Sequence, residues 1–165
     1  YETHGELNAD KSNVILYPTW YTGRHMDNRA AIGEGRALDP TKYFIIVPDM
    51  FGNGLSSSPT NTPSPHDRGR FPLTTTYDNI RAQKRLCEEV LGINKIRSVV
   101  GFSMSAQQAF HWGAVYPEMV QSIAPICGSA KTSPHDWLHL EGMKRALQTD
   151  PNWEGGDYEK PPEAG

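Results

Sequence analysis

One stretch, residues 96–113, constrains the fold of this chain more than any other, because its pattern changes from strand to helix at a turn of small residues. The apolar residues that end at Val100 are typical of a buried parallel strand. Beyond Ser103 the pattern becomes helical, since Ala106 and Phe110 lie four positions apart. The sequence therefore predicts a strand, a sharp turn and a helix with Ser103 at the turn, which is the context of a nucleophile elbow.

The residues around Ser103 fit the chemistry of such a turn. A serine at the tip of a strained turn can be reached by a base on one side and by a substrate carbonyl on the other. The residues two before and two after it come close together and must be small. Gly101 meets this requirement fully, and Ser105 meets it less well than the usual glycine. The amide of Met104, in the first turn of the helix, lacks an intrahelical partner and can donate to an oxyanion. The motif alone is equally compatible with an ordinary strand-to-helix turn.

Composition and charge narrow the class of protein. The 165 residues suffice for one domain with a core, and the net charge of −3 comes from interspersed acidic and basic residues, without the basic patch of nucleic-acid binders. There is no apolar stretch of membrane-spanning length and no signal-peptide pattern, so we expect no membrane partner and a cytoplasmic location. Cys87 and Cys127 make no disulfide framework, and both are expected to pack in the core.

Both ends of the sequence resemble positions inside a longer chain. Tyr1 is not an initiator methionine, and the polar, proline-rich residues 159–165 close no element. We therefore expect residues 1–165 to form part of a longer domain.

Apolar runs alternate with helical patterns along the chain, and no internal repeat is present. Such alternation predicts an α/β fold with a parallel sheet. The predicted elements are a strand remnant and polar turn within 1–13, strands at 14–17, 43–47, 96–100 and 120–126, helices at 76–91, 104–116 and 134–147, a short helix within 24–38 and a long loop at 50–73.

Four residues lie shortly after the ends of predicted strands. Tyr21, Asp49, Ser103 and Gly128 each come after a different strand. Ligands of parallel sheets bind at the carboxyl ends of the strands, so these residues are expected at one edge of the sheet. Their placement there favours a functional turn at Ser103.

A series of short stretches, in order along nearly the whole chain, carries a family resemblance. The chain resembles the homoserine O-acetyltransferase branch of the α/β-hydrolase family, a branch that also contains hydrolases. The matching stretches include Tyr1-Glu2-Thr3, Thr22-Gly23, Leu38-Asp39-Pro40, Phe71-Pro72, Leu91-Gly92-Ile93, Ser103-Met104, Asp150-Pro151 and Gly155-Gly156-Asp157-Tyr158.

The resemblance implies a fold and a set of roles. The fold would be a mostly parallel sheet flanked by helices, with a helical lid, and the chain would stop before the lid and the last strands. Ser103 would be the acyl-carrying nucleophile, and the backbone amides of Met104 and Tyr21 would hold the oxyanion. The catalytic aspartate and histidine would lie beyond Gly165. A homodimer through the missing lid would also follow.

Departures from the family pattern cluster near the expected substrate entrance. The acetyltransferases carry an asparagine, a Gly-Gly-Cys run and Gly-Ser-Thr-Gly-Pro where this chain has Asp49, Gly52-Asn53-Gly54 and Ser56-Ser57-Ser58-Pro59. These changes suit the hydrolases of the branch at least as well. They leave open whether homoserine is the acceptor.

The histidines after Ser103 do not supply an obvious base. His111 lies in the helix after the turn and cannot reach back to the serine. His135 and His139 lie one turn apart on a later helix, as in H-E-x-x-H zinc sites, but Asp136 replaces the glutamate and no third ligand stands out. We therefore expect no metal site and no base for Ser103 within this chain.

Aromatic and acidic side chains near the strand ends are candidates for substrate binding. Trp20 and Phe51 are as compatible with packing under a lid, and Asp49 with capping of its own loop. The predicted function is serine-dependent acyl transfer from acetyl-CoA, as co-substrate, to an alcohol such as homoserine, with no bound cofactor. The alternatives are hydrolysis of a small ester or thioester by the same machinery, and a non-catalytic α/β domain.

Overall fold

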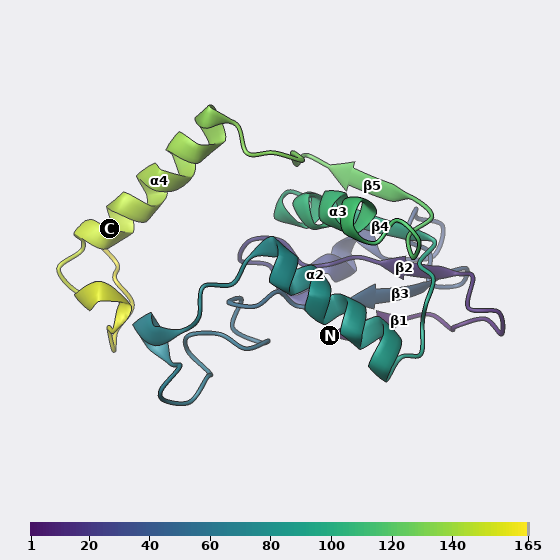
Figure 1. Ribbon diagram of the computed structural model, residues 1–165, viewed down its shortest axis with the longest axis horizontal. Coiled ribbons are helices and arrows are strands. Elements are labelled where there is room, and N and C mark those ends of the chain that lie inside the picture. Colours follow the sequence, from purple (N-terminus) through teal and green to yellow (C-terminus); the bar gives the residue numbers. More distant parts are fainter. Residues whose placement is uncertain (165) are drawn as a thin grey trace.

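The protein forms a five-stranded sheet with helices on both faces. The computed structural model describes residues 1–164. The strand order is β1-β3-β2-β4-β5, and every neighbouring pair is parallel except β1 with β3, which is antiparallel. Figure 1 shows the sheet with α2 and α3 in front of it. A mostly parallel α/β sheet, as predicted, is confirmed.

The elements lie close to the positions predicted from the sequence. The strands are β1 (Glu2–His4), β2 (Val14–Leu16), β3 (Phe44–Val47), β4 (Ser98–Phe102) and β5 (Ile123–Ile126), the α-helices are α1 (His25–Asn28), α2 (Thr76–Arg85), α3 (Met104–Val115) and α4 (Pro134–Thr149), and the shorter helical turns are η1 (Arg29–Ala31), η2 (Arg68–Arg70), η3 (Leu86–Val90) and η4 (Glu154–Gly156).

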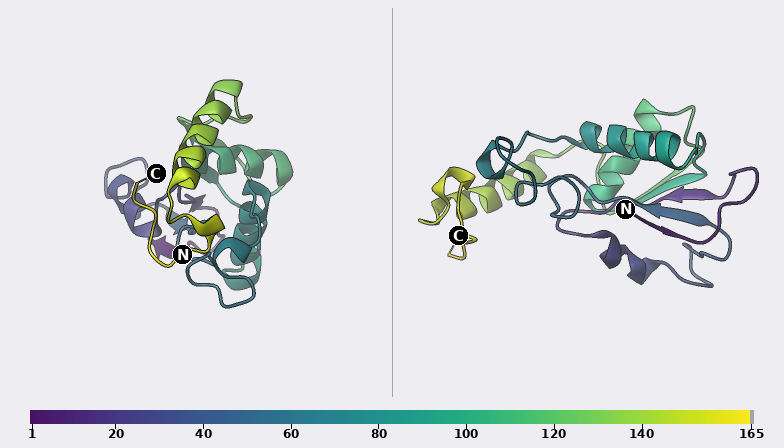
Figure 2. Two further views of the ribbon diagram at one scale, coloured as in Figure 1. Left: turned by 90° about the vertical axis from the view of Figure 1, so that its left-hand side faces the viewer. Right: turned by 90° about the horizontal axis from the view of Figure 1, so that it is seen from below.

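The core has one part on each face of the sheet. The larger part lies under α2 and α3, where Leu16, Val99 and Trp112 are fully buried. The smaller part lies on the opposite face and includes Ile15 and Ile45, which alternate with the residues of the first part along their strands. Figure 2 shows α2 and α3 on one side of the sheet and α1 on the other.

Two predicted elements differ from the observed ones by more than two residues in length. The strand predicted at 120–126 is shortened to β5, with Val120 joined to Ile96 only by an isolated bridge. Pro125 lacks an amide for a further strand, which fits its place on an outer strand of this sheet. The helix predicted at 76–91 ends as an α-helix at Arg85 and continues as the π-helix η3, before Gly92 stops it with a φ of 62°.

The last elements extend from the sheet and its helices. Ser133 caps α4, with its hydroxyl accepting from the backbone N–H of Asp136, as the Ser-Pro pair predicted. In Figures 1 and 2, α4 and η4 lie beside the loop that contains η2. None of the helices in residues 1–164 combines the length and hydropathy needed to cross a bilayer.

Candidate active site

Ser103 occupies a strained turn between β4 and α3. Its φ is 57° and its ψ is −124°, a conformation that non-glycine residues rarely adopt. The turn is held by backbone hydrogen bonds, because the N–H of Ser103 donates to the carbonyl of Ile126 at 2.9 Å and its carbonyl accepts from Ala106 N–H at 2.9 Å. The strand, turn and helix predicted around Ser103 are therefore confirmed, while its role stays a prediction.

Two glycines make room for this turn. A Cβ at Gly101 would lie 2.2 Å from the carbonyl oxygen of Ser105, and a Cβ at Gly128 would lie 2.6 Å from that of Ser103. Both distances are far inside van der Waals contact. Ser105 is accommodated because its side chain points away from Gly101 and donates to the carbonyl of Pro18 at 2.6 Å.

Two residues whose backbone amides have no partner in residues 1–164 line the same cavity as Ser103. Met104 is the first residue of α3, where an N–H has no intrahelical partner, and the N–H of Tyr21 donates to no atom of residues 1–164. Tyr21, Ser103 and Met104 all line one cavity of about 580 Å³. Donors arranged in this way can stabilise an oxyanion.

The strand order explains why these residues meet. Tyr21 follows β2 and Ser103 follows β4, and these two strands are parallel neighbours. Gly128 follows β5, the neighbour of β4 on its other side. Asp49 follows β3, which lies beyond β2 and so further from Ser103. The common edge of the sheet was correctly predicted, but it is long enough to hold more than one pocket.

No base contacts Ser103 within the described part of the chain. Its hydroxyl forms no hydrogen bond to any of residues 1–164. His139 and Asp136 of α4 line the same cavity, but Asp136 accepts a hydrogen bond from the Ser133 hydroxyl, at 2.8 Å, within its capping box. Across residues 1–164 there is no group of three or more His, Cys, Asp or Glu residues able to hold a metal ion.

The two cysteines lie in different environments. Cys87 is fully buried, as predicted, and burial raises the pKa of its thiol to about 12. Cys127 was predicted in the core, and this is wrong, because it is exposed and lines the cavity of Ser103. It follows β5, whose last residue, Ile126, is itself 49% exposed.

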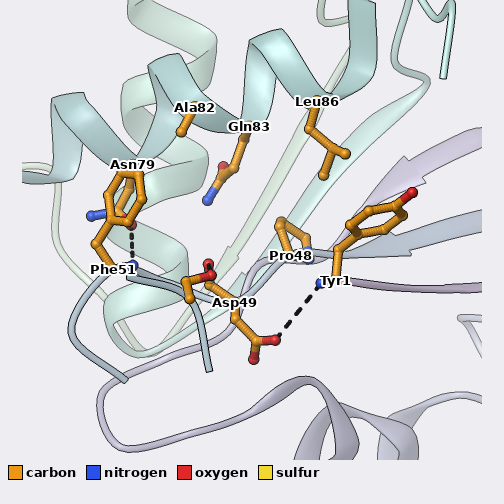
Figure 3. Close-up of a pocket in the computed structure, with 9 residues that line it drawn as sticks. Tyr1, Pro48, Asp49, Phe51, Asn79, Ala82, Gln83 and Leu86 are labelled. Atoms are coloured by element: carbon orange, nitrogen blue, oxygen red, sulfur yellow. Dashed lines mark hydrogen bonds and ion pairs between the residues drawn. The ribbon is translucent and has the colours of Figure 1, made fainter. Parts of the chain in front are cut away.

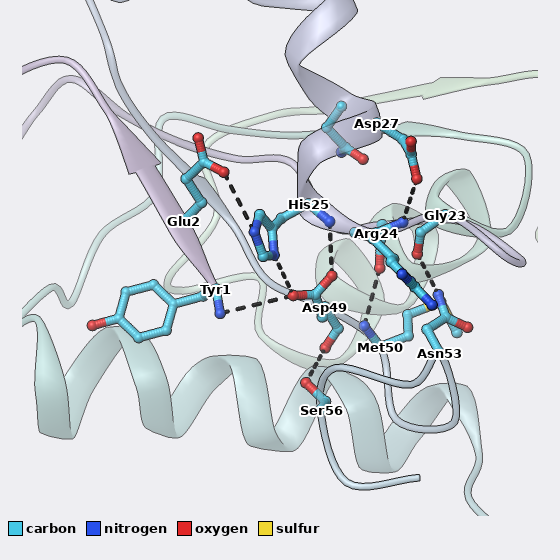
Figure 4. Close-up of polar contacts among 12 residues, drawn as sticks. Tyr1, Glu2, Gly23, Arg24, His25, Asp27, Asp49, Met50, Asn53 and Ser56 are labelled. Atoms are coloured by element: carbon cyan, nitrogen blue, oxygen red, sulfur yellow. Dashed lines mark hydrogen bonds and ion pairs between the residues drawn. The ribbon is translucent and has the colours of Figure 1, made fainter. Parts of the chain in front are cut away.

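Asp49 belongs to a polar cluster away from Ser103. Its side chain is only 2% exposed, and its Oδ1 accepts from the backbone N–H of His25 at 2.7 Å while its Oδ2 lies 2.6 Å from His25 Nδ1 (Figure 4). Glu2 lies on the other side of the His25 ring, and its hydrogen bonds to Arg29 lower the pKa of its carboxyl. Both Asp49 oxygens are thus engaged, an arrangement that favours the loop-capping interpretation.

Phe51 and Asp49 line a second, smaller cavity. This cavity of about 170 Å³ lies against α2, and Figure 3 shows both residues among those that line it. The backbone N–H of Phe51 donates to Asn79 Oδ1 at 2.9 Å. Phe51 is therefore not brought together with Ser103 in residues 1–164.

Trp20 packs beneath its loop. Its ring meets that of Phe102 edge-on, with centroids 6.2 Å apart, and a Cβ at Gly23 would lie 2.9 Å from its indole. It does not line the cavity of Ser103. Packing is the interpretation that this geometry favours.

Side chains that the sequence did not single out hold the loop that carries Tyr21. Four successive carbonyls of this loop, from residue 17 to residue 20, each accept from a side-chain donor. The bonds run from Asn28 Nδ2 to Tyr17 and Pro18, from Ser105 Oγ to Pro18, from Gln108 Nε2 to Thr19 and from Asn53 Nδ2 to Trp20. The only signals in the sequence were the departures from the family pattern at Asn53 and Ser105.

Comparison with known proteins matches this geometry to a described family. The model of the alpha/beta hydrolase fold matches residues 13–164. An ethyl acetate hydrolase from Pseudomonas veronii is 47% identical over 156 residues, which cover 94% of this chain and 45% of the relative. A homoserine O-acetyltransferase from Methanohalobium evestigatum is 38% identical over 184 residues, which cover 100% of this chain and 37% of the relative.

A solved structure shows the same arrangement of elements. An acetylester hydrolase from Corynebacterium glutamicum superposes with a TM-score of 0.94 at 43% identity, over 96% of this chain and 46% of that one. The chain thus spans less than half the length of each of these proteins.

Proposed function

Since the chain belongs to the alpha/beta hydrolase fold family, we propose that the whole protein hydrolyses carboxylic esters, with Ser103 as its nucleophile. The observation that carries the proposal is the strained turn at Ser103, which lines a cavity together with Met104 and Tyr21. The relatives named for hydrolysis of ethyl acetate and acetyl esters indicate acetyl esters of small alcohols as the substrate class.

The proposed reaction proceeds through an acyl-enzyme. The Oγ of Ser103 attacks the ester carbonyl and passes its proton to a histidine, and the N–H groups of Met104 and Tyr21 donate to the oxygen that gains charge. Collapse of this tetrahedral intermediate expels the alcohol, which takes the proton from the histidine, and leaves the acyl group on Ser103. Water then attacks the acyl group while the histidine takes one of its protons, and the carboxylic acid leaves as the histidine returns that proton to Ser103 Oγ. By the family resemblance, we expect the histidine and its orienting acid to lie beyond Gly165.

Hydrolysis is better supported than acyl transfer. The esterase relatives are 43–47% identical to this chain, whereas the homoserine O-acetyltransferase above is 38% identical. The loop after β3 also departs from the acetyltransferase pattern, with Asp49 and Asn53 engaged in contacts within the protein. Our first prediction, transfer from acetyl-CoA to homoserine, therefore becomes the second candidate.

The nucleophile is tested with the full-length protein and 4-nitrophenyl acetate. We expect Ser103→Ala to lower kcat by at least about a thousandfold, because the acyl-enzyme cannot form. Ser122→Ala is the matched control, since it removes an exposed serine hydroxyl that donates to the carbonyl of Arg97 at 2.8 Å. Hydrolysis that survives Ser103→Ala undiminished would contradict the proposal and favour a non-catalytic domain.

Transfer and hydrolysis differ in what attacks the acyl-enzyme. With acetyl-CoA or an activated acetyl ester and an excess of homoserine, the fraction of acetyl groups recovered as free acetate measures the partition. The proposal expects acetate as the main product. Acetylated homoserine as the main product would support the second candidate instead.

A further inference from the structure

Asn53 holds the peptide group that contains the N–H of Tyr21. Its Nδ2 donates to the carbonyl of Trp20 at 2.9 Å, and this carbonyl belongs to the peptide unit that joins Trp20 to Tyr21. That bond is trans, and a trans peptide is planar with its C=O and N–H pointing in opposite directions. Fixing the direction of the Trp20 oxygen therefore fixes the direction of the Tyr21 N–H.

The peptide group lies at the start of a strained turn. The N–H of Gly23 donates to the carbonyl of Trp20 at 3.0 Å, which closes a turn with Tyr21 and Thr22 at its centre. Thr22 has a φ of 62°, a costly conformation for a β-branched residue, at about 1–3 kcal/mol. Contacts from outside are needed to hold such a turn in one conformation.

Asn53 supplies contacts to both ends of this turn. Besides Trp20, its Nδ2 donates to the carbonyl of Gly23 at 2.6 Å, a bond visible in Figure 4. Because both partners are carbonyl oxygens, only the NH₂ group of the amide can face them, which settles the orientation of the side chain. A single side-chain amide thus clamps the turn by donating to the carbonyls of its first and last residues.

The loop after β3 is shaped to present this amide. Gly52 and Gly54 flank Asn53 and have φ values of 86° and 91°, which other residues adopt only with strain. The N–H of Gly54 donates to Ser58 Oγ at 2.7 Å, and the N–H of Gly52 donates to the carbonyl of Ser57 at 3.0 Å. The Gly-Asn-Gly sequence therefore has a local structural reason.

The other donors act on neighbouring peptide groups. Ser105 holds the carbonyl of Pro18 and Gln108 holds that of Thr19, so neither acts on the peptide unit that contains the Tyr21 N–H. Asn53 is the side-chain donor, among residues 1–164, that acts on this unit directly.

We propose that Asn53 is a positioning residue for ester hydrolysis, which aims the Tyr21 N–H at the oxyanion by clamping the Trp20–Gly23 turn. The inference rests on the proposed function of Ser103 and Tyr21. An oxyanion donor contributes most when it is fixed before the reaction, so loosening this turn weakens the transition state more than the bound ester.

The test compares Asn53→Ala with Asn61→Ala in the full-length protein. Asn61 lies in the same loop and donates to the carbonyls of Gly54 and Ser56, contacts that do not reach the Tyr21 turn. With 4-nitrophenyl acetate we expect Asn53→Ala to lower kcat by about 10-fold to 100-fold with KM changed less than about twofold, and Asn61→Ala to change neither by more than about twofold. Affinity for a trifluoromethyl ketone, which forms a tetrahedral adduct with serine, is expected to fall by the same factor as kcat/KM in Asn53→Ala.

Asn53→Asp provides a second variant that keeps the shape of the side chain but, when ionised, has no donor. It is expected to lose kcat over the same range, so the inference stays testable if Asn53→Ala does not fold.

Unchanged kcat in the Asn53 variants, while Ser103→Ala is inactive, would overturn the inference and leave the proposed function standing. Equal losses in the Asn53 and Asn61 variants would overturn it as well, because the effect would then come from loosening of the whole loop. Full activity in Ser103→Ala would overturn both proposals.

Discussion

Three of the six non-glycine residues with positive φ in residues 1–164 lie at or next to the cavity of Ser103. Ser103, Cys127 and Thr22 have φ values of 57°, 53° and 62°, and all three lie in or beside the loops that form this cavity. Each such residue costs about 1–3 kcal/mol and persists only where its surroundings enforce it. The hydrogen bonds of Ser103 to Ile126 and Ala106 are one such constraint.

The two thiols are expected to differ sharply in reactivity. The pKa of Cys87 is raised to about 12 by burial, so at pH 8 only about one part in ten thousand of it is thiolate. Cys127 is exposed at the cavity. Iodoacetamide at about pH 8, followed by peptide mass spectrometry, should therefore modify Cys127 and spare Cys87 in the folded protein. The modification should also slow ester hydrolysis.

Unfolding in urea provides the control for this labelling. Both thiols should react at similar rates once the chain is unfolded, because the burial of Cys87 is then lost. Comparable labelling of Cys87 in the folded protein would contradict the burial seen here.

At this scale, sequence reasoning succeeded where the constraint is local. The turn at Ser103 was predicted because Gly101 and the change of period lie within a few residues of it. The contacts of Asn53 and Asp49 were not predicted, because each joins loops that follow different strands. Which loops become neighbours depends on the strand order, and the spacing of residues along the chain does not encode it.

Among the elements, a buried series of side-chain hydrogen bonds joins the two helices on one face of the sheet to the loop of Tyr21. Trp112 Nε1 donates to Gln83 Oε1 at 2.9 Å, Gln83 Nε2 donates to Gln108 Oε1 at 2.7 Å, and Gln108 Nε2 donates to the carbonyl of Thr19 at 2.9 Å. All of the residues in this hydrogen-bonded series are buried or nearly so. The series fixes α3, and with it Ser103, relative to the Tyr21 loop.

Gln108→Leu tests the contribution of this hydrogen-bonded series to stability. The substitution leaves Gln83 Nε2 and the Thr19 carbonyl buried without these partners, and we expect the free energy of unfolding to fall by about 3 kcal/mol. Urea denaturation followed by circular dichroism measures the change. Gln121→Leu, at an exposed position, is the control and should change it by less than about 0.5 kcal/mol. Equal stability of the two variants would contradict this role for Gln108.

Element boundaries could be predicted only where a residue that starts or stops a helix marks them. Gly92 and the Ser133-Pro134 pair ended and began their helices as predicted. The start of β5 was misplaced, because the apolar residues from Val120 predict a strand whether or not they pair with a neighbour. Which residues of a strand form hydrogen bonds depends on the neighbouring strand. The sequence pattern therefore predicts that a strand is present but not where it begins and ends.

On the scale of the whole molecule, the segment after α4 contacts the long loop before α2. Arg70 lies 2.8 Å from Asp157 and 3.0 Å from Asp67, and Arg68 donates to the carbonyl of Asp157 at 3.1 Å. Gly69 packs closely there, since a Cβ on it would lie 3.0 Å from the carbonyl oxygen of Gly155. The predicted loop at 50–73 therefore has a structural partner late in the chain.

Arg70→Ala should loosen this tie without unfolding the protein. Exposed ion pairs contribute little to global stability, so we expect the melting temperature to change only slightly. Amide hydrogen exchange in residues 150–158 should nevertheless become several times faster, because local opening no longer has to break the contacts to Asp67 and Asp157. KM for small esters should rise as well, since residues of α4 line the cavity of Ser103.

The matched control removes an ion pair of the same kind elsewhere. Arg85→Ala breaks the pair with Glu89 in the helical segment against the sheet, where Arg85 Nε lies 2.9 Å from the carboxylate, and should leave exchange in residues 150–158 unchanged. Salt at about 0.5 M should reproduce part of the Arg70→Ala effect in the unmodified protein, because it screens exposed charges. If exchange in residues 150–158 were the same in Arg70→Ala and in the unmodified protein, packing around Gly69 would be what holds this segment, and the ion pairs would be incidental to it.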